Sequence, residues 1–212
     1  MLKQSWENPI LDRFIVFEGI DGSGTTTQAK RLTAYLNRNS THTAEFTFEP
    51  TDRPIGTTIR ALLNDPVGAH PWTLALLFAA DRNEHLEHSE TGICSTIARG
   101  VTVVCDRYLF SSLAYQGALA AFDEVETLNC RFPLPKTLFF IDTPIATAQE
   151  RMRSREALDL LEGDAVQTRV EAMYRTVIKE FSKRYPSMVH IIDGSQDEET
   201  VFRRIVSVLD RL

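Results

Sequence analysis

The sequence predicts an α/β fold in which helices cover both faces of a parallel β-sheet. Two observations predict it: several short segments are apolar almost throughout, and longer segments with apolar residues at helical spacing separate them. Strands that are buried on both faces, as in parallel sheets, have this continuous apolar character. The expected strands are Phe14–Phe17, Ala44–Phe48, Val101–Cys105, Leu138–Ile141 and Val189–Ile192, of which Ala44–Phe48 alternates most.

Length and composition are ordinary for one globular domain, with 212 residues, 43% hydrophobic and 25% charged. We expect a single domain over residues 1–212, with residues 1–13 as an extension before the first strand and no secretory signal. No segment reaches the roughly 18–20 apolar residues of a membrane span, so we expect no membrane partner. A net charge of −6 disfavours a nucleic-acid polymer as partner, and three cysteines without paired spacing favour a reducing, cytoplasmic location.

A glycine-rich segment, GIDGSGTTT at Gly19–Thr27, follows the first expected strand. Its spacing matches the phosphate-binding pattern G-x-x-x-x-G-K-[ST], except that Thr25 stands where the lysine is expected. Such a loop binds phosphate through backbone N–H groups at the start of the next helix, whose apolar face Ala29, Leu32 and Leu36 would form. That context disfavours a plain strand-to-helix turn. The predicted phosphate-binding residues are Gly19, Asp21, Gly22, Ser23, Gly24, Thr25, Thr26 and Thr27, with the Thr26 hydroxyl on Mg²⁺.

Three further helices are predicted from the residues at their starts. Thr143-Pro144 combines a capping residue with proline at the first helical position. Asp164 precedes a long segment with apolar residues at helical spacing, and Ser195–Glu198 matches a capping box before another such segment.

Polar motifs follow the expected strands or lie on neighbouring helices. They are Phe48–Gly56, Leu76–Arg82, Asp106–Gly117 and the arginine-rich stretch Arg151–Arg155. Ligands of open parallel sheets bind beyond the carboxyl ends of the strands, so these motifs can converge on one site.

Together with the glycine-rich loop, these motifs resemble those of the thymidylate kinase family, P-loop enzymes that phosphorylate dTMP with ATP. FEGIDGSG, EP, LLFAADR, DRY, SS-x-AYQG and IDGSQ occur in the family's order over nearly the whole chain after the first dozen residues. The resemblance implies a P-loop nucleoside-monophosphate-kinase fold, a five-stranded parallel sheet of order 2-3-1-4-5 flanked by helices, and a short lid at about 151–163. It also implies Mg²⁺ as cofactor and a homodimer.

The resemblance implies roles for residues around the base and sugar of dTMP. Phe78 would stack on the pyrimidine, and Arg82, one helical turn on, would reach the thymine carbonyl edge. Ser112 would contact the base edge. Asp21 would accept a hydrogen bond from the 3′-hydroxyl, and Tyr115 would crowd the 2′ position.

Other implied roles concern phosphate and metal. Arg107 would bind the phosphate of dTMP and the transferred group with its planar fork of donors, and Asp106 would hold the Mg²⁺ shell. The dTMP set is completed by Glu49, Pro50, Ser111 and Gln116, and Gly194, Ser195 and Gln196 would border the adenine. Individually, Phe78 could be a core residue, Tyr115 could simply pack, and Asp106 with Arg107 could form a surface ion pair. Only the joint pattern favours the nucleotide site.

The match fails at Thr25, because a lysine there would counter phosphate charge during transfer. A charge pair at ~4 Å is worth about 4 kcal/mol at an effective dielectric constant of 20, and Lys30 lies too far along the helix to replace it. We expect a lid arginine to assume this role, and the predicted catalytic residues are therefore Arg107, Asp21, Arg151, Arg153 and Arg155.

A second departure is Phe48, where the family usually has an arginine that binds the dTMP phosphate. Arg53 is the expected substitute, with a surface loop arginine as the alternative. Two other functions stay open on the sequence: a kinase of another deoxynucleoside monophosphate, and a non-catalytic nucleotide-binding module.

Overall fold

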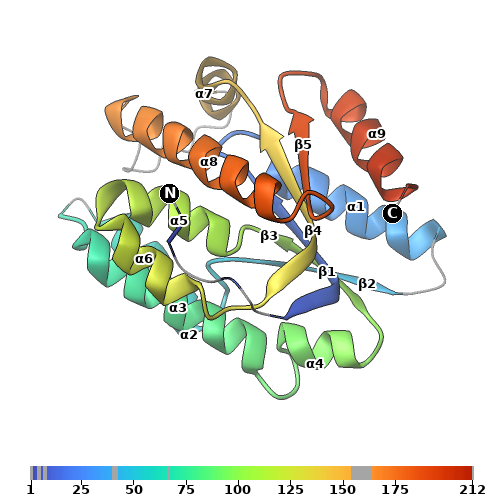
Figure 1. Ribbon diagram of the computed structural model, residues 1–212, viewed down its shortest axis with the longest axis horizontal. Coiled ribbons are helices and arrows are strands. Elements are labelled where there is room, and N and C mark those ends of the chain that lie inside the picture. The colour runs from blue at the N-terminus through green and yellow to red at the C-terminus, as the bar shows by residue number, and fades with distance from the viewer. Residues whose placement is uncertain are drawn as a thin grey trace.

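A computed structural model describes residues 2–3, 6, 9–39, 43–65, 67–153 and 164–211. Its centre is a five-stranded sheet in the order β2-β3-β1-β4-β5 (Figure 1). Every pair of neighbouring strands is parallel. The strands are β1 (Ile10–Glu18), β2 (Ala44–Phe48), β3 (Thr102–Asp106), β4 (Leu134–Asp142) and β5 (Val189–Asp193). The parallel sheet and its expected strand order are thereby confirmed.

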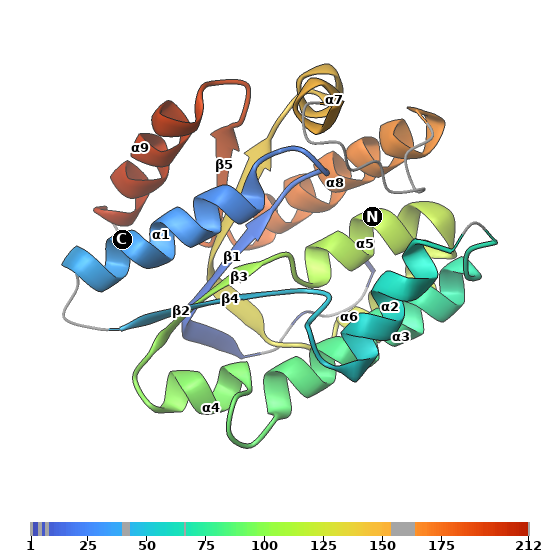
Figure 2. The same ribbon diagram turned by 180° about the vertical axis from the view of Figure 1, so that it is seen from behind.

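Helices cover both faces of the sheet, with α1 and α9 on one side and α3, α5 and α8 on the other, as the two opposite views show (Figures 1 and 2). The helices are α1 (Thr25–Asn39), α2 (Pro54–Leu63), α3 (Pro71–Glu87), α4 (Ile93–Ala98), α5 (Leu109–Leu119), α6 (Phe122–Asn129), α7 (Ile145–Arg153), α8 (Asp164–Arg184) and α9 (Glu198–Leu209). None of these helices combines the length and apolar character needed to span a bilayer.

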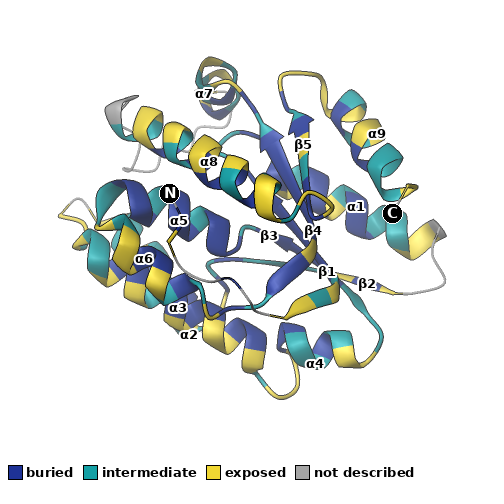
Figure 3. Cartoon of the chain, in the orientation of Figure 1, coloured by how far each residue is buried: buried dark blue, intermediate teal, exposed yellow. Residues whose placement is uncertain are grey.

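The alternation of side chains along each strand divides the core into two layers. Ile15 and Phe17 of β1 pack toward α1 and α9, whereas Phe14 and Val16 pack toward α5 and α8. Because both layers are apolar, the central strands are buried on both faces, and Figure 3 shows them dark between helices whose outer faces are exposed. This double burial is why the strands read as continuous apolar runs.

The expectation that residues 1–13 precede the first strand is wrong, because β1 begins at Ile10. Ile10 and Leu11 pair with Leu134 and Pro135 of β4, and their side chains remain partly exposed. Polar residues are therefore tolerated there, and Asp12 and Arg13 interrupt the apolar run, which hides the start of the strand in the sequence. The segment before β1 is also docked: the buried Trp6 ring contacts Phe181 of α8 at 5.0 Å between centroids.

The start of α9 also differs from expectation. Asp197, not Ser195, caps this helix, since its carboxylate accepts a hydrogen bond from the backbone N–H of Thr200 at 2.9 Å. Ser195 instead donates its hydroxyl to Asp193 at 2.6 Å. The capping residue thus lies later in the chain than the capping-box pattern predicted.

All five strands end at the same edge of the sheet, and the polar motifs follow there. Register places Phe17 of β1 beside Asp106 of β3, and Phe48 of β2 beside the same aspartate. The sheet therefore brings the glycine-rich loop, the segment after β2 and the segment after β3 together.

Candidate active site

Two of the hollows that the described residues form at this edge of the sheet combine residues from several predicted motifs. The larger, here called the central pocket, has a volume of about 280 Å³. The residues that line it are Asp21, Phe48, Glu49, Pro50, Arg60, Leu63, Phe78, Arg82, Asp106, Arg107, Tyr108, Ser111, Tyr115 and Gln116. Most of the residues predicted for dTMP therefore share one pocket. Ser112 lies behind its wall, where its hydroxyl accepts a hydrogen bond from Arg82 at 3.1 Å.

Arg107 projects from the turn between β3 and α5 toward the glycine-rich loop. Its φ of +68° is in the left-handed region, which is uncommon for a side chain with a Cβ and is found at functional turns. The guanidinium donates to Asp21 Oδ1 at 2.5 Å and to the carbonyl of Gly19 at 3.1 Å. Burial disfavours the charged guanidinium, but the carboxylates of Asp21 and Asp106 outweigh it and raise the pKa of Arg107, so the guanidinium stays charged.

Asp21 links this arginine to Tyr115. The Tyr115 hydroxyl donates to Asp21 Oδ2 at 2.7 Å, and the Tyr115 ring lies 5.4 Å below the Arg107 guanidinium. Burial raises the pKa of Tyr115, so its phenol stays protonated and keeps donating to the carboxylate. The three side chains form one wall of the pocket next to the glycine-rich loop.

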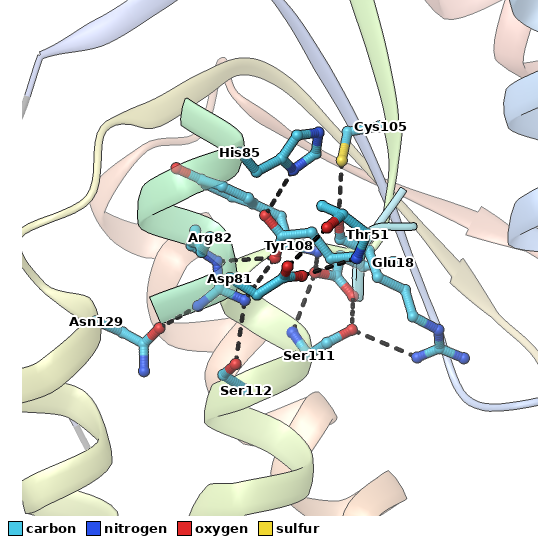
Figure 4. A network of polar contacts seen from close by, with 12 residues as sticks. Glu18, Thr51, Asp81, Arg82, His85, Cys105, Tyr108, Ser111, Ser112 and Asn129 are labelled. Carbon is cyan, nitrogen blue, oxygen red and sulfur yellow. Dashed lines mark hydrogen bonds and ion pairs between the residues drawn. The ribbon is translucent and has the colours of Figure 1, made fainter. Parts of the chain in front are cut away.

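A buried polar network holds Arg82 at the opposite wall (Figure 4). Arg82 is 1% exposed and donates Nε to Glu49 Oε2 at 2.9 Å, with further bonds to Asn129 and Ser112. The other Glu49 oxygen lies 3.1 Å from Nδ1 of His85. Buried charges of this kind persist only when paired and hydrogen-bonded, and a network with its bonds made is rigid. Glu49 lines the pocket, but its oxygens are engaged by Arg82 and His85.

The residue before Arg82 fixes the segment that follows β2. Asp81 is fully buried, and its carboxylate accepts from the backbone N–H of Thr51 at 2.7 Å and from its hydroxyl at 2.6 Å. Figure 4 shows Asp81 and Thr51 beside one another. Consecutive residues of α3 therefore hold the Glu49–Thr51 segment, which carries Pro50 into the pocket wall.

Sequence reasoning missed Arg60. It lies on α2, lines the central pocket and donates to the carbonyl of Pro50 at 2.7 Å. Arg53, the expected substitute for the family's arginine, does not line this pocket and instead contacts Thr91 and, at 3.7 Å, Glu84. Pro54 predicts a helix start, and Arg60 then falls in its second turn, which is the signal that could have identified it.

The oxygen atoms of Thr26 and Asp106 meet between the two hollows. The Thr26 hydroxyl donates to Asp106 Oδ2, and Asp106 Oδ1 is buried without a hydrogen-bond partner in the described part of the chain. An orphaned carboxylate oxygen beside a hydroxyl fits Mg²⁺, a hard cation that binds one or two protein oxygens together with water and phosphate. The described residues contain no cluster of three or more His, Cys, Asp or Glu side chains suited to a metal, as expected for such a site.

The smaller hollow, here called the loop pocket, has a volume of about 100 Å³. It is lined by Gly22, Ser23, Gly24, Thr27, Gln28, Arg151, Gln196, Glu198 and Val201. It thus combines loop residues predicted for phosphate, one predicted lid arginine and one residue predicted to border adenine.

Glycine at position 22 is what lets α7 approach the loop. Gly22 has a φ of +79°, and a Cβ there would lie 2.4 Å from the carbonyl oxygen of Ala148. This contact brings Arg151, near the end of α7, to the loop pocket, where it donates to the carbonyl of Gln196 at 3.0 Å. Arg153 is exposed and lines neither hollow. Arg155 lies outside the described residues.

The residue in the lysine position is not available to a ligand in this arrangement. Thr25 is 4% exposed and lines neither hollow. Gly194, predicted to border the adenine, packs against Thr143, and the Ser195 hydroxyl is engaged by Asp193. Gln196 alone of that predicted group lines the loop pocket.

Comparisons with known proteins agree with this geometry. The thymidylate kinase family model matches residues 17–205. A protein of Treponema pallidum (strain Nichols) assigned as a thymidylate kinase is 42% identical over 199 residues, 93% of this chain and 94% of its own. A Methanocaldococcus jannaschii protein assigned in the same way is 37% identical over 80% of this chain and 83% of its own. The crystal structure of thymidylate kinase from Ehrlichia chaffeensis superimposes with a TM-score of 0.66 at 27% identity, covering 93% of this chain and 97% of that one. The chain belongs to the thymidylate kinase family.

Proposed function

We propose that the protein transfers the γ-phosphoryl group of ATP to dTMP, giving ADP and dTDP. The observation that carries this proposal is the central pocket, which joins a pyrimidine-sized wall at Phe78 and Arg82 to the charged end at Arg107 and the glycine-rich loop. A nucleoside monophosphate has the same two ends, a flat base and a dianionic phosphate. The family supports dTMP as that nucleotide.

The base end suits thymine because Arg82 is held in place before a ligand arrives. Glu49, Asn129 and Ser112 occupy its donors on the far side. A preorganised donor loses little freedom on binding and so contributes more to affinity. Phe78 lines the same pocket and would stack on the ring.

Two arginines of the central pocket, Arg60 and Arg107, are available for the phosphate end. Both contact groups of the protein itself, Arg60 the Pro50 carbonyl and Asp52, and Arg107 the Asp21 carboxylate. An arriving phosphate would present charged oxygens to both arginines. Arg–phosphate pairs are strong and bidentate. Release of Arg107 to the phosphate would also free Asp21 and Tyr115 for the sugar.

The donor triphosphate would occupy the loop pocket, where backbone N–H groups at the start of α1 face Arg151 and Gln196. Thr26 and Asp106 would hold Mg²⁺, which would offset the negative charge of the donor phosphates. The residues of this chain align the two phosphates, and a dTMP phosphate oxygen attacks without a covalent enzyme intermediate. Arg151 is the guanidinium that geometry favours as the replacement for the missing lysine. The family further supports a homodimer, and three cysteines without paired spacing in the sequence support a cytoplasmic location.

An assay of ADP release tests the proposal. Purified protein with ATP, Mg²⁺ and dTMP should release ADP at least ten times faster than with dCMP, dAMP or dGMP. The C4 carbonyl of thymine can accept a hydrogen bond from Arg82, whereas cytosine has an amino donor at C4 and a purine ring is larger. Faster turnover of another monophosphate would reassign the acceptor. Nucleotide binding without any turnover would instead identify a non-catalytic module.

A further inference from the structure

Behind Arg107, three oxygen-bearing side chains meet, of which Ser111 also lines the central pocket. Glu18 ends β1, Ser111 lies in the first turn of α5, and Tyr174 comes from the middle of α8. Glu18 and Tyr174 are each 0% exposed. Ser111 Oγ lies 2.6 Å from Glu18 Oε2, Tyr174 Oη lies 2.9 Å from the same oxygen, and the two hydroxyl oxygens lie 2.7 Å apart. We call these three groups the oxygen triangle.

The second oxygen of Glu18 anchors the start of α5. Oε1 accepts backbone N–H bonds from Tyr108 at 2.8 Å and from Ser111 at 3.0 Å, and Figure 4 shows Glu18 and Ser111 together. The first N–H groups of a helix lack helical partners, and the positive end of the helix favours a carboxylate. No side chain local to α5 caps it, so Glu18 performs that role from the neighbouring strand.

The oxygen triangle touches Arg107 directly. Nη1 of Arg107 lies 3.4 Å from both Ser111 Oγ and Tyr174 Oη, while Nη2 faces Asp21. The residue after Arg107 is the first whose N–H bonds to Glu18. Glu18 is therefore connected to Arg107 in two ways. One runs through the backbone next to Arg107, and the other runs through the two hydroxyl groups that contact its guanidinium.

We propose that Glu18 is the positioning residue for Arg107, acting through the hydroxyl groups of Ser111 and Tyr174, and that its ionised form aims Arg107 at the acceptor phosphate. This inference rests on the proposed function, in which Arg107 binds the phosphate of dTMP. Because Tyr174 lies on α8, the cluster also connects that helix to the acceptor end of the site.

A count of protons explains why ionisation matters. The triangle has three edges of hydrogen-bond length, but two hydroxyls supply only two protons. With Glu18 ionised, both protons point to its carboxylate, and the lone pairs of Ser111 and Tyr174 remain for the N–H of Arg107. A proton on Glu18 supplies the hydrogen for the third edge and removes the negative charge. The two hydroxyl protons are then no longer both directed at the carboxylate, so the lone pairs are no longer reserved for Arg107.

The surroundings of Glu18 favour exchange between its protonated and ionised forms near neutral pH. Burial raises the pKa of Glu18 to about 7, while Ser111, Arg107, Tyr174 and the Tyr108 N–H act in the opposite direction. The titratable groups that face Glu18 from the packed elements are Arg107, Cys105 and Tyr174, and burial keeps the thiol and the phenol protonated by raising their pKa values.

The first test compares wild type with Glu18→Gln in kcat/KM for dTMP between pH 6 and 8.5, at saturating ATP and Mg²⁺. The profile reports groups of the free enzyme and substrate, and a phosphate monoester itself titrates with a pKa of about 6. Dividing the wild-type kcat/KM by that of Glu18→Gln at each pH cancels the titration of the substrate. Glutamine mimics the protonated acid, so the ratio should be near one at pH 6 and rise about tenfold by pH 8.5. A ratio that does not change with pH overturns the proposal.

The second test needs no change at Glu18. Tyr174→Phe removes one hydrogen bond to the carboxylate, so the pH midpoint should move upward and KM for dTMP should rise several-fold with KM for ATP unchanged. Tyr185→Phe is the matched control, since its hydroxyl donates to the Trp6 carbonyl at 2.5 Å, just beyond the far end of α8. Identical profiles for these variants would also overturn the proposal. Loss of dTMP turnover in wild type would contradict the function instead.

Discussion

Nη2 of Arg82 lies 2.7 Å from Oε2 of Glu49, and both side chains are buried where α3 meets the end of β2. Through this pair Glu49, the residue directly after β2, supports the arginine that we propose to contact the base. Glu49 is therefore expected to act on the nucleotide through Arg82. Its second oxygen, at 3.1 Å from His85, fixes the carboxylate in turn.

Glu49→Gln should weaken dTMP binding and stability together. Removing one member of a buried ion pair typically costs about 3–5 kcal/mol, because the remaining charge stays buried. We expect a loss of that order in the free energy of unfolding by urea denaturation. KM for dTMP should rise about tenfold, with KM for ATP unchanged. Glu45→Gln on the preceding strand β2, where the side chain is exposed, is the control and should change neither quantity. A normal KM in folded Glu49→Gln would separate Arg82 from this support.

Arg60 and Arg53 make opposite predictions for the acceptor phosphate. A hydrogen bond to a charged group is worth about 1.5–3 kcal/mol, so Arg60→Ala should raise KM for dTMP about 10–100-fold. Arg53→Ala removes an arginine that contacts Thr91 and Glu84, and KM should change less than about threefold. Steady-state kinetics at saturating ATP decide the matter. A large effect at Arg53 alone would show that it turns into the pocket when the nucleotide binds.

Asp106→Asn should weaken the binding of Mg²⁺ but not the binding of dTMP in the central pocket. Loss of a carboxylate near a metal commonly costs about 10–100-fold in metal affinity. The Mg²⁺ concentration for half-maximal ADP release should rise by at least about tenfold. Binding of dTMP measured calorimetrically without Mg²⁺ should stay within about twofold of wild type. Asp12→Asn, an exposed residue of β1 paired with Lys136, is the control. An unchanged Mg²⁺ requirement would remove Asp106 from the metal shell.

Much of the site could be predicted because its residues follow strand ends directly. Asp21, Asp106 and Arg107 lie within a few residues of the ends of β1 and β3, and parallel pairing brings such positions together. Phe78 and Arg82 share one helix face, so local spacing was enough for them. The outline of the fold was readable for the same reason, since strands buried on both faces are apolar throughout.

Residues whose role depends on a distant partner could not be predicted in this way. Arg60 reaches the pocket only because α2 folds back over Pro50, and Glu18 meets Tyr174 on one face of the sheet although they are 156 residues apart in the sequence. Nothing local to β1 shows that Ile10 belongs to it, because that part of the strand pairs only with β4 in the described structure. Tertiary packing decides such positions.

The ionisation of Glu18 should also appear in the stability of the protein. A carboxyl group with a pKa raised from 4.5 to about 7 binds its proton more tightly when folded. The contribution of Glu18 to the free energy of unfolding is therefore fully present below pH 4.5. It is lost as the pH rises toward 7, and amounts to about 3 kcal/mol for a shift of this size. The free energy of unfolding of Glu18→Gln, relative to wild type, should rise by that amount between pH 4.5 and 8. A difference that is constant with pH would show that Glu18 titrates normally.

The replacement of the missing lysine by an arginine is tested most directly by one rate constant. We expect Arg151→Ala to lower the single-turnover rate of phosphoryl transfer by about 10³-fold at saturating ATP and dTMP, the scale of arginines that stabilise this transition state. Arg153→Ala, which removes an exposed arginine of the same helix, should stay within about twofold of wild type. A rate for Arg151→Ala equal to that of Arg153→Ala would contradict the account, because the loop would then work without this guanidinium.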